Sequence, residues 1–454
     1  MLIKNAYIIN ADESVQADIL INDGKITRID STIRETKDTG ELIDAQGLFV
    51  FPGGIDVHTH MELPVGDTKS SDDFESGTIA AISGGTTTII DFTTPVHGEF
   101  LINNLNDRLE LAEKSFCDYS LHIGVTYFNE NTTKEIEECV KKGFTSFKIY
   151  MAYKDTIGLN DEDIIKVLEA AQRMNALVMV HCENGDLINE LRINFITKGQ
   201  TTPEYHPLSR PSETEREAVN RILTYAKIIN TAVYIVHTST GDSVSEIEKA
   251  KLSGQKIFAE TCPQYLFLDE TKYLLPGFES AKYVLSPPLR LKVNQEKLWD
   301  GLNKNILDVV STDHCPFNFI GQKEIGKNDF TKIPNGAGGI ENRLHLLYTY
   351  GVLGNKISLN KFVEITSCNP AKIFGLYPQK GIIKEGSDAD LILWNPEEEF
   401  VISAKNQFQN CDYNLYDGFK IKGAPKLVIK GGKTVFKDGK FIKENCKGKL
   451  LIRK

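Results

Sequence analysis

The sequence predicts an α/β protein, a TIM-like (β/α)8 barrel with a small β-sandwich domain formed by both ends of the chain. Three observations predict this fold. The 454 residues exceed one minimal core but suit a barrel with a small second domain. The middle of the chain alternates short apolar runs with amphipathic segments, as βα units around a parallel sheet do. Both ends instead carry short β segments separated by turns that contain Gly.

The two ends of the chain share one β-rich pattern. Near the start, LIKNAYII, ADILINDGKITRI and LIDAQGLFVF are expected strands, with Asn-Asp-Gly as a turn. The pattern returns in KGIIKEGSDADLILW, PKLVIKGGKTVF and KDGKFI. We therefore expect residues 1–51 and 379–454 to form the sandwich domain and residues 52–378 to form the barrel.

The barrel elements are expected from their apolar patterns. Helical spacing of apolar residues follows acidic or Ser/Thr starts in DEDIIKVLEAAQRM and ETEREAVNRILTYAKII. The candidate strands between such helices are TTTIIDF, YSLHIGV, TSFKIYM, LVMVH, AVYIVH, KIFAE and LDVVSTD. This number of strands with intervening helices favours a closed barrel over an open sheet.

Composition narrows the class of partner. The chain has 52 Lys+Arg against 62 Asp+Glu, and its net charge of −10 disfavours nucleic acid or an anionic membrane as the main partner. A small neutral molecule fits better. The eight cysteines form no Cys-x-x-Cys pair, so we expect free thiols in a reducing cytoplasm. The amino terminus has no signal-peptide pattern, and no apolar run is long enough to span a bilayer, so a soluble protein is expected.

Residues of metal-ligand type occur where the apolar runs stop. His58 and His60 lie two residues apart and would share one face of a strand. His181, His237 and Asp313 each close a later candidate strand. In a β/α barrel these carboxyl ends form the catalytic face. Lys148 lies inside an apolar run, where a buried ammonium is strongly disfavoured unless it is paired or modified.

The motifs together resemble those of dihydropyrimidinases and bacterial hydantoinases, which are cyclic amidases of the amidohydrolase superfamily. The segments that carry the resemblance are GGIDVHTHMELP, GFTSFKIYMAYK, VMVHCENGDL, AETCPQYLFLD, YVLSPPLR, STDHCPFN and DFTKIPNG. They run in order through the whole barrel, and the flanking β segments match as well. The resemblance implies a zinc-dependent hydrolase of pyrimidine catabolism, in which Lys148 is carboxylated to N6-carboxylysine.

The resemblance also implies a site with two Zn²⁺ ions per subunit. One ion would be held by His58, His60, the Lys148 carbamate and Asp313, and the other by the carbamate, His181 and His237. Nitrogen and oxygen ligands with an open position suit catalytic zinc, although Mn²⁺, Co²⁺ or Ni²⁺ could substitute.

The expected reaction opens a ring amide of a cyclic ureide to an N-carbamoyl amino acid. A hydroxide between the two ions would attack the carbonyl, with Asp313 as general acid and base. By motif match, Tyr153 would stabilise the oxyanion and also contact the substrate. Main-chain groups at Ser286 and Asn335 would bind the edge of the ring.

Several alternatives stay open from the sequence. Dihydroorotases and allantoinases share the barrel and the metal pair, but the Arg that typically binds the carboxylate of dihydroorotate is replaced here by Glu62, for which Arg290 could compensate. A non-catalytic scaffold of the same fold is disfavoured because all six ligand positions are present. The preference between 5,6-dihydropyrimidines and 5-substituted hydantoins is undecided, and the family implies the D form and a homotetramer.

The remaining histidines and two cysteines beside the site have plainer interpretations. Histidines 97, 122, 206, 314 and 345 have no partner at ligand spacing and are expected to be structural or solvated. His314 should point away from the neighbouring Asp313, since adjacent residues of an extended chain face opposite sides. Cys182 and Cys315 are expected to pack rather than bind metal.

Overall fold

The barrel predicted from the sequence is confirmed. The computed structural model describes residues 1–36, 39–154 and 156–453. Eight parallel strands form one sheet in the order β15-β14-β13-β12-β11-β10-β9-β6. A parallel bridge between Thr59 and His314 brings its two edge strands together, so the sheet curls into a nearly closed barrel. The strands are β6 (Gly54–Thr59), β9 (Thr86–Phe92), β10 (Asp118–Gly124), β11 (Ser146–Tyr150), β12 (Leu177–His181), β13 (Val233–Ile235), β14 (Ile257–Thr261) and β15 (Val309–Val310).

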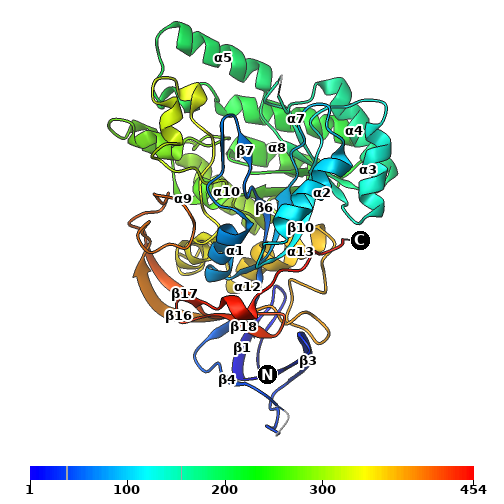
Figure 1. The fold of residues 1–454 in the computed structure, drawn as a ribbon, viewed down its shortest axis with the longest axis vertical. Coiled ribbons are helices and arrows are strands. Elements are labelled where there is room, and N and C mark those ends of the chain that lie inside the picture. Colours follow the sequence, from blue (N-terminus) through cyan, green and yellow to red (C-terminus); the bar gives the residue numbers. More distant parts are fainter. Residues whose placement is uncertain (37–38, 155, 454) are drawn as a thin grey trace.

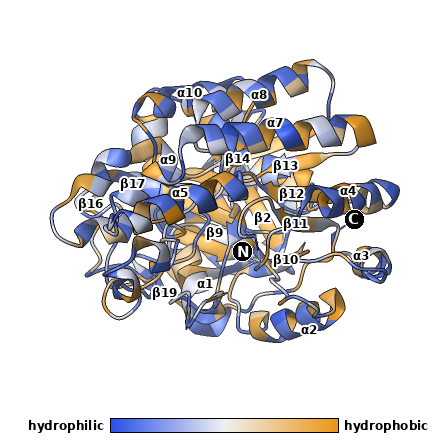
Figure 2. Cartoon of the chain, turned by 90° about the horizontal axis from the view of Figure 1, so that it is seen from above, coloured by the Kyte–Doolittle hydropathy of each residue, from blue (hydrophilic) through white to orange (hydrophobic). Residues whose placement is uncertain are grey.

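Helices surround the strands, whose apolar residues occupy the centre of the view in Figure 2. Helix α4 begins with a side-chain cap, since the side chain of Asn160 accepts a hydrogen bond from the N–H of Asp163. The long helices are α1 (Phe74–Ser83), α2 (Leu101–Ala112), α3 (Thr132–Lys141), α4 (Asp161–Arg173), α5 (Gly185–Thr197), α7 (Ser212–Ile229), α8 (Gly241–Leu252) and α10 (Val293–Asn303). Shorter elements are β7 (Pro64–Val65), β8 (Thr68–Lys69), α6 (Tyr205–Leu208), α9 (Pro263–Phe267), α11 (Arg343–Leu346), α12 (Leu359–Val363) and α13 (Asn369–Ile373).

Both ends of the chain build one sheet below the barrel (Figure 1). The two ends join where β5 pairs antiparallel with β16, with Val50 opposite Leu393. The strands are β1 (Leu2–Ile9), β2 (Ser14–Asn22), β3 (Lys25–Asp30), β4 (Leu42–Asp44), β5 (Phe49–Pro52), β16 (Leu391–Val401), β17 (Lys420–Lys430), β18 (Lys433–Lys437) and β19 (Lys440–Phe441). The last residues return to the barrel, where Leu451 N–H donates to the carbonyl of Tyr119. The division at residues 51 and 378 stays a prediction.

A buried ion cluster links the barrel to the segment that enters β16. The ammonium of Lys380 lies 2.5 Å from carboxylate oxygens of both Asp118 and Asp390 and 3.1 Å from Asp388. These three aspartates lie close enough to hold a metal ion, but the ammonium already occupies the space between them. The cluster is therefore structural. Within the described ranges, no helix is long and apolar enough to cross a membrane.

Candidate metal centre

The structure brings the six predicted ligand residues to the carboxyl end of the barrel. His58 lies in β6 and His181 ends β12, while Lys148 lies in β11. His237 and Asp313 come two and three residues after β13 and β15 end, so the apolar runs of the sequence are longer than the strands. Both have left-handed backbones, with φ of 37° and 53°. Non-glycine residues adopt this conformation infrequently, and strain of this kind concentrates at functional sites.

Three of these side chains form one compact group. The Oδ1 of Asp313 lies 3.1 Å from Nε2 of His58 and 3.2 Å from Nε2 of His60. Their ligand-type atoms all lie within 4.8 Å of one another. One cation could therefore be held by two imidazole nitrogens and a carboxylate oxygen.

A pair of histidines lies beside this group of three. His181 Nδ1 and His237 Nε2 are 2.9 Å apart, and the rings of His58 and His237 lie 5.5 Å apart between centroids. Burial lowers the pKa of His181 and lowers the pKa values of His58 and His237 well below the ordinary value. All three imidazoles are thus neutral near pH 7 and offer the lone pairs that a metal requires.

Lys148 is enclosed by aromatic rings. It is 1% exposed, and its Nζ lies 5.2 Å from the ring centroids of both Phe92 and Tyr150. Burial lowers the pKa of Lys148 to about 8, although Asp313 favours the charged form. The amine therefore has a substantial neutral fraction near neutral pH, and a neutral amine is the form that can add carbon dioxide.

A buried carboxylate orients His58. Glu260, at the end of β14, contacts Nδ1 of His58, which leaves Nε2 facing Asp313. Burial raises the pKa of Glu260 to about 7, but its ionised form is favoured by the hydroxyl of Tyr234 at 2.8 Å and the N–H of His237 at 3.1 Å. A carboxylate behind a histidine that faces a metal fixes the tautomer and raises the basicity of the ligand nitrogen.

A second carboxylate does the same for His181. The Oε2 of Glu183 lies 2.9 Å from Nε2 of His181, on the opposite side of the ring from His237. The same oxygen accepts a hydrogen bond from Arg210 at 2.6 Å. Sequence reasoning missed both glutamates. The available signal for Glu260 was a carboxylate directly after the apolar residues of β14, and the signal for Glu183 was a carboxylate two residues after β12 ends.

The three predicted substrate contacts lie near this centre. The Tyr153 ring is 5.1 Å from that of His181, with the Arg210 guanidinium 5.5 Å from its centroid. Burial raises the pKa of Tyr153, partly offset by Arg210 and by a hydrogen bond with Ser286. The amide of Asn335 donates to the hydroxyl of Ser286 at 3.0 Å. The structure therefore brings Tyr153, Ser286 and Asn335 into one connected group beside the metal centre.

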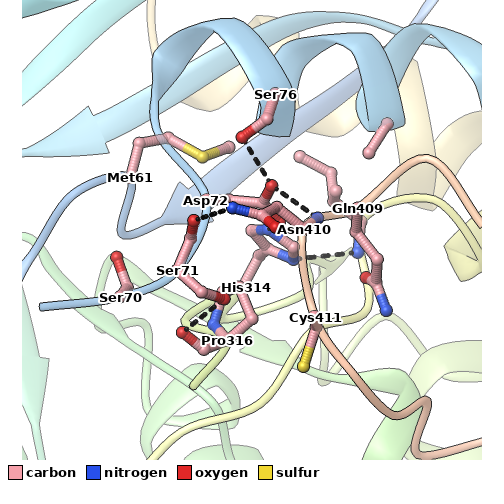
Figure 3. Close-up of polar contacts among 12 residues, drawn as sticks. Met61, Ser70, Ser71, Asp72, Ser76, His314, Pro316, Gln409, Asn410 and Cys411 are labelled. Atoms are coloured by element: carbon pink, nitrogen blue, oxygen red, sulfur yellow. Dashed lines mark hydrogen bonds and ion pairs between the residues drawn. The ribbon is translucent and has the colours of Figure 1, made fainter. Parts of the chain in front are cut away.

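His314 points away from Asp313, as the sequence predicts. Its Nε2 lies 3.0 Å from Asp72, whose other oxygen accepts hydrogen bonds from Ser76 and from the backbone of Asn410 (Figure 3). The carboxylate thereby ties the Asp313 loop to α1 and to the segment after β16. Cys182 and Cys315 are both buried free thiols.

Comparison with known proteins decides the family. A model described as the amidohydrolase family matches residues 49–441. The chain belongs to this family. It is 44% identical to a D-hydantoinase of Ralstonia pickettii, over 100% of this chain and 99% of the relative. A D-hydantoinase of Geobacillus stearothermophilus is also 44% identical, over 100% and 96%.

Solved structures place the chain among the hydantoinases and dihydropyrimidinases of the amidohydrolase family. A dihydropyrimidinase from Brevibacillus agri superposes with a TM-score of 0.97 at 43% identity, covering 100% of this chain and 98% of that one. An L-hydantoinase from Arthrobacter aurescens superposes with a TM-score of 0.90 at 28% identity, covering 100% of this chain and 99% of that one. The predicted family and fold class are thus confirmed.

The donor set of this amidohydrolase fits a pair of metal ions. Nδ1 of His181 and Nε2 of His237 lie 2.9 Å apart, and because Nε2 of His181 faces the carboxylate of Glu183, Nδ1 of a neutral His181 carries the lone pair that a metal could bind. The imidazoles of His58 and His60 both lie next to the same oxygen of Asp313. Neutral imidazole nitrogens and a carboxylate oxygen gathered in one place are the donors that a catalytic metal ion takes.

Proposed function

We propose that this chain hydrolyses the ring amide of 5,6-dihydropyrimidines, 5-substituted hydantoins or both, and releases N-carbamoyl amino acids. The observation that carries the proposal is the convergence of four histidines, an aspartate and a buried lysine at the carboxyl end of the barrel. The names of the full-length relatives at 42–44% identity support the same class of reaction.

The proposed cofactor is a pair of Zn²⁺ ions. His58, His60 and Asp313 would hold one ion and His181 with His237 the other. Lys148, carboxylated on Nζ, would supply one oxygen to each, which replaces a costly buried cation with an anion. When bound, such a metal pair lowers the pKa of water towards neutrality and polarises the carbonyl of the substrate.

Asp313 is the proposed proton carrier. Its Oδ1 faces His58 and His60, and these imidazoles help to lower the pKa of Asp313 although burial opposes them. The carboxylate is thus ionised at neutral pH and able to take the proton of the attacking water and return it to the leaving ring nitrogen.

Tyr153 and the Ser286–Asn335 pair are the proposed substrate contacts. The phenol of Tyr153 keeps its proton because burial raises its pKa, so it can donate a hydrogen bond to an oxyanion. Main-chain groups at Ser286 and Asn335 would bind the ring edge. Both residues are close to one another and next to Tyr153.

The charges around the site favour neutral substrates over dihydroorotate. Glu62 pairs with Lys69 at 3.3 Å and presents no cation to a substrate carboxylate. Arg290 is buried, donates to the hydroxyl of Ser239 and pairs with Glu215. Its guanidinium is therefore committed to the protein. Because neither residue offers a free cation to a substrate carboxylate, we rank the neutral dihydropyrimidines and hydantoins before dihydroorotate.

Several finer properties belong to the proposal. The D-hydantoinase relatives at 42–44% identity, against 28% for the L-hydantoinase structure, support the D form. We also propose a homotetramer in the cytoplasm that acts on small cyclic ureides without a nucleic acid or membrane partner, and a sandwich domain of residues 1–51 and 379–454.

The test is metal analysis of protein purified without chelator, followed by rates on dihydrouracil, hydantoin, phenylhydantoin, dihydroorotate and allantoin. We expect bound zinc and the highest rates on the first three substrates. A Lys148→Ala variant should lose at least one metal ion and nearly all activity, whereas Lys142→Ala, at an exposed position after α3, should keep both. Faster turnover of dihydroorotate than of dihydrouracil would contradict the ranking, and metal-free active protein would contradict the mechanism.

A further inference from the structure

A second buried lysine lies outside the metal centre. Lys323 is 0% exposed and begins the short 3-10 helix η3 (Lys323–Gly326). Its ammonium donates hydrogen bonds to the main-chain carbonyls of Val284 at 2.8 Å, Pro334 at 2.7 Å and Gly336 at 2.8 Å. A buried lysine normally pairs with a carboxylate, so an ammonium bound by three carbonyls requires another explanation.

The number of donors matches the number of acceptors. A protonated lysine has three N–H groups, and each is directed to one of the three carbonyls. Burial lowers the pKa of Lys323 to about 7; the three carbonyl oxygens can only accept hydrogen bonds, so their arrangement suits the protonated amine. Without the ammonium, three buried carbonyls would lose a charge-assisted partner.

The carbonyls belong to the two loops that carry the proposed ring contacts. Val284 lies two residues before Ser286, and Pro334 and Gly336 flank Asn335 on both sides. The loops also contact each other directly, because Gly336 N–H donates to the carbonyl of Val284 at 3.1 Å. The ammonium is thus the point at which both loops meet.

We propose that Lys323 is a positioning residue for substrate binding, which holds the main chains around Ser286 and Asn335 in register with each other. The inference rests on the proposed function, since that function assigns the ring edge to these loops. Lys323 hydrogen-bonds to loop carbonyls and not to the six metal-ligand residues, so it should govern binding of the ring and leave metal loading intact.

The test compares Lys323→Met with Lys332→Met. Lys332 lies nine residues later and its side chain is 68% exposed, so this variant controls for loss of a lysine in the same segment. We expect Lys323→Met to raise KM about tenfold or more with kcat changed less than about threefold, since small displacements of binding groups are costly. Zinc content should equal that of the wild type. Lys323→Gln, which keeps two N–H donors, should give an intermediate KM.

Hydrogen exchange gives a readout that does not depend on activity. Amides of residues 284–286, 335 and 336 should exchange faster in Lys323→Met, and amides of β11 and β12 should not change. An unchanged KM and unchanged exchange in folded Lys323→Met would overturn the inference. Failure of both Lys323 variants to fold would overturn it too, because the ammonium would then stabilise the whole chain. A wild type that hydrolyses no cyclic ureide would instead reject the proposed function, while loop exchange would still decide whether Lys323 holds the loops.

Discussion

Replacing Glu183 with Gln removes the negative charge behind His181 and keeps the shape of the side chain. In the structure one oxygen of Glu183 serves both His181 and Arg210, and Glu183 and Arg210 are 0% and 2% exposed. A glutamine would leave the Arg210 guanidinium buried without its anion. We therefore expect Glu183→Gln to weaken both the fold and the metal centre.

The magnitude follows from the pKa of Glu183. Burial alone would raise this pKa, but Arg210 and the hydrogen bond from His181 outweigh burial and bring it from 4.5 to about 2. Each unit is worth about 1.4 kcal/mol, so the ionised carboxylate stabilises the fold by roughly 3 kcal/mol at neutral pH. Loss of the carboxylate that orients a metal-binding histidine typically lowers metal affinity about 10- to 100-fold.

The assay has two parts. Urea denaturation of metal-free wild type and Glu183→Gln gives the stability difference, and competition with a chromophoric chelator gives the zinc affinity. Glu217→Gln is the matched control, since Glu217 lies in α7, its side chain is 45% exposed and it pairs with Arg221; such pairs contribute about 0–1 kcal/mol. A variant within about 0.5 kcal/mol of the control and with wild-type zinc affinity would refute the reasoning.

Three further substitutions test other parts of the structure. Gly336→Ala should destabilise the chain by a few kcal/mol and raise KM, because φ is 141° and a Cβ would lie 2.5 Å from the carbonyl oxygen of Cys315; Gly339→Ala, whose Cβ would meet nothing closer than 3.8 Å, should change neither denaturation midpoint nor KM. Burial lowers the pKa of His345 to about 4, so the unfolded chain binds a proton that the folded chain does not, and the wild type should lose about 1.4 kcal/mol per pH unit from this group as pH falls from about 6.5 to 4. His345→Gln should show a shallower acid slope, and an equal slope would contradict this origin. Lys380→Met should cost about 3–5 kcal/mol by leaving the buried Asp390 without its cation, since Asp118 keeps Lys430 and Asp388 keeps Lys25, whereas the exposed Lys304→Met should cost less than about 1 kcal/mol; equal midpoints would show that the Lys380 ammonium contributes nothing.

The pattern of the sequence was sufficient to predict the barrel and to predict which residues lie at its carboxyl end. Runs such as LVMVH mark both a strand and the ligand-type residue that ends it, and His181 is indeed the last residue of β12. The strand β15 covers only two residues of LDVVSTD. Apolar runs indicate which residues are buried, not which residues form strand hydrogen bonds. The chain stays buried for a few residues after β13 and β15 end, so the apolar runs are longer than these strands.

The sequence did not show which side chains or carbonyls, distant along the chain, the buried charged residues Glu260 and Lys323 contact. Glu260 meets His58 across 202 positions, and Lys323 meets Val284 across 39. Periodicity tells which face of an element is buried, but it does not tell which groups meet there. Glu260 and Lys323 were therefore visible only as charged residues in apolar or loop surroundings, and the structure shows what each of them contacts.

The most direct test of the central claim is diffraction from crystals of freshly purified protein grown without chelator, with anomalous data at the zinc edge. We expect two metal peaks between the four histidines and Asp313, with density for a carboxylated Lys148 reaching both. A bare lysine amine beside an empty cavity would contradict the account, because the site would then have no means of activating water.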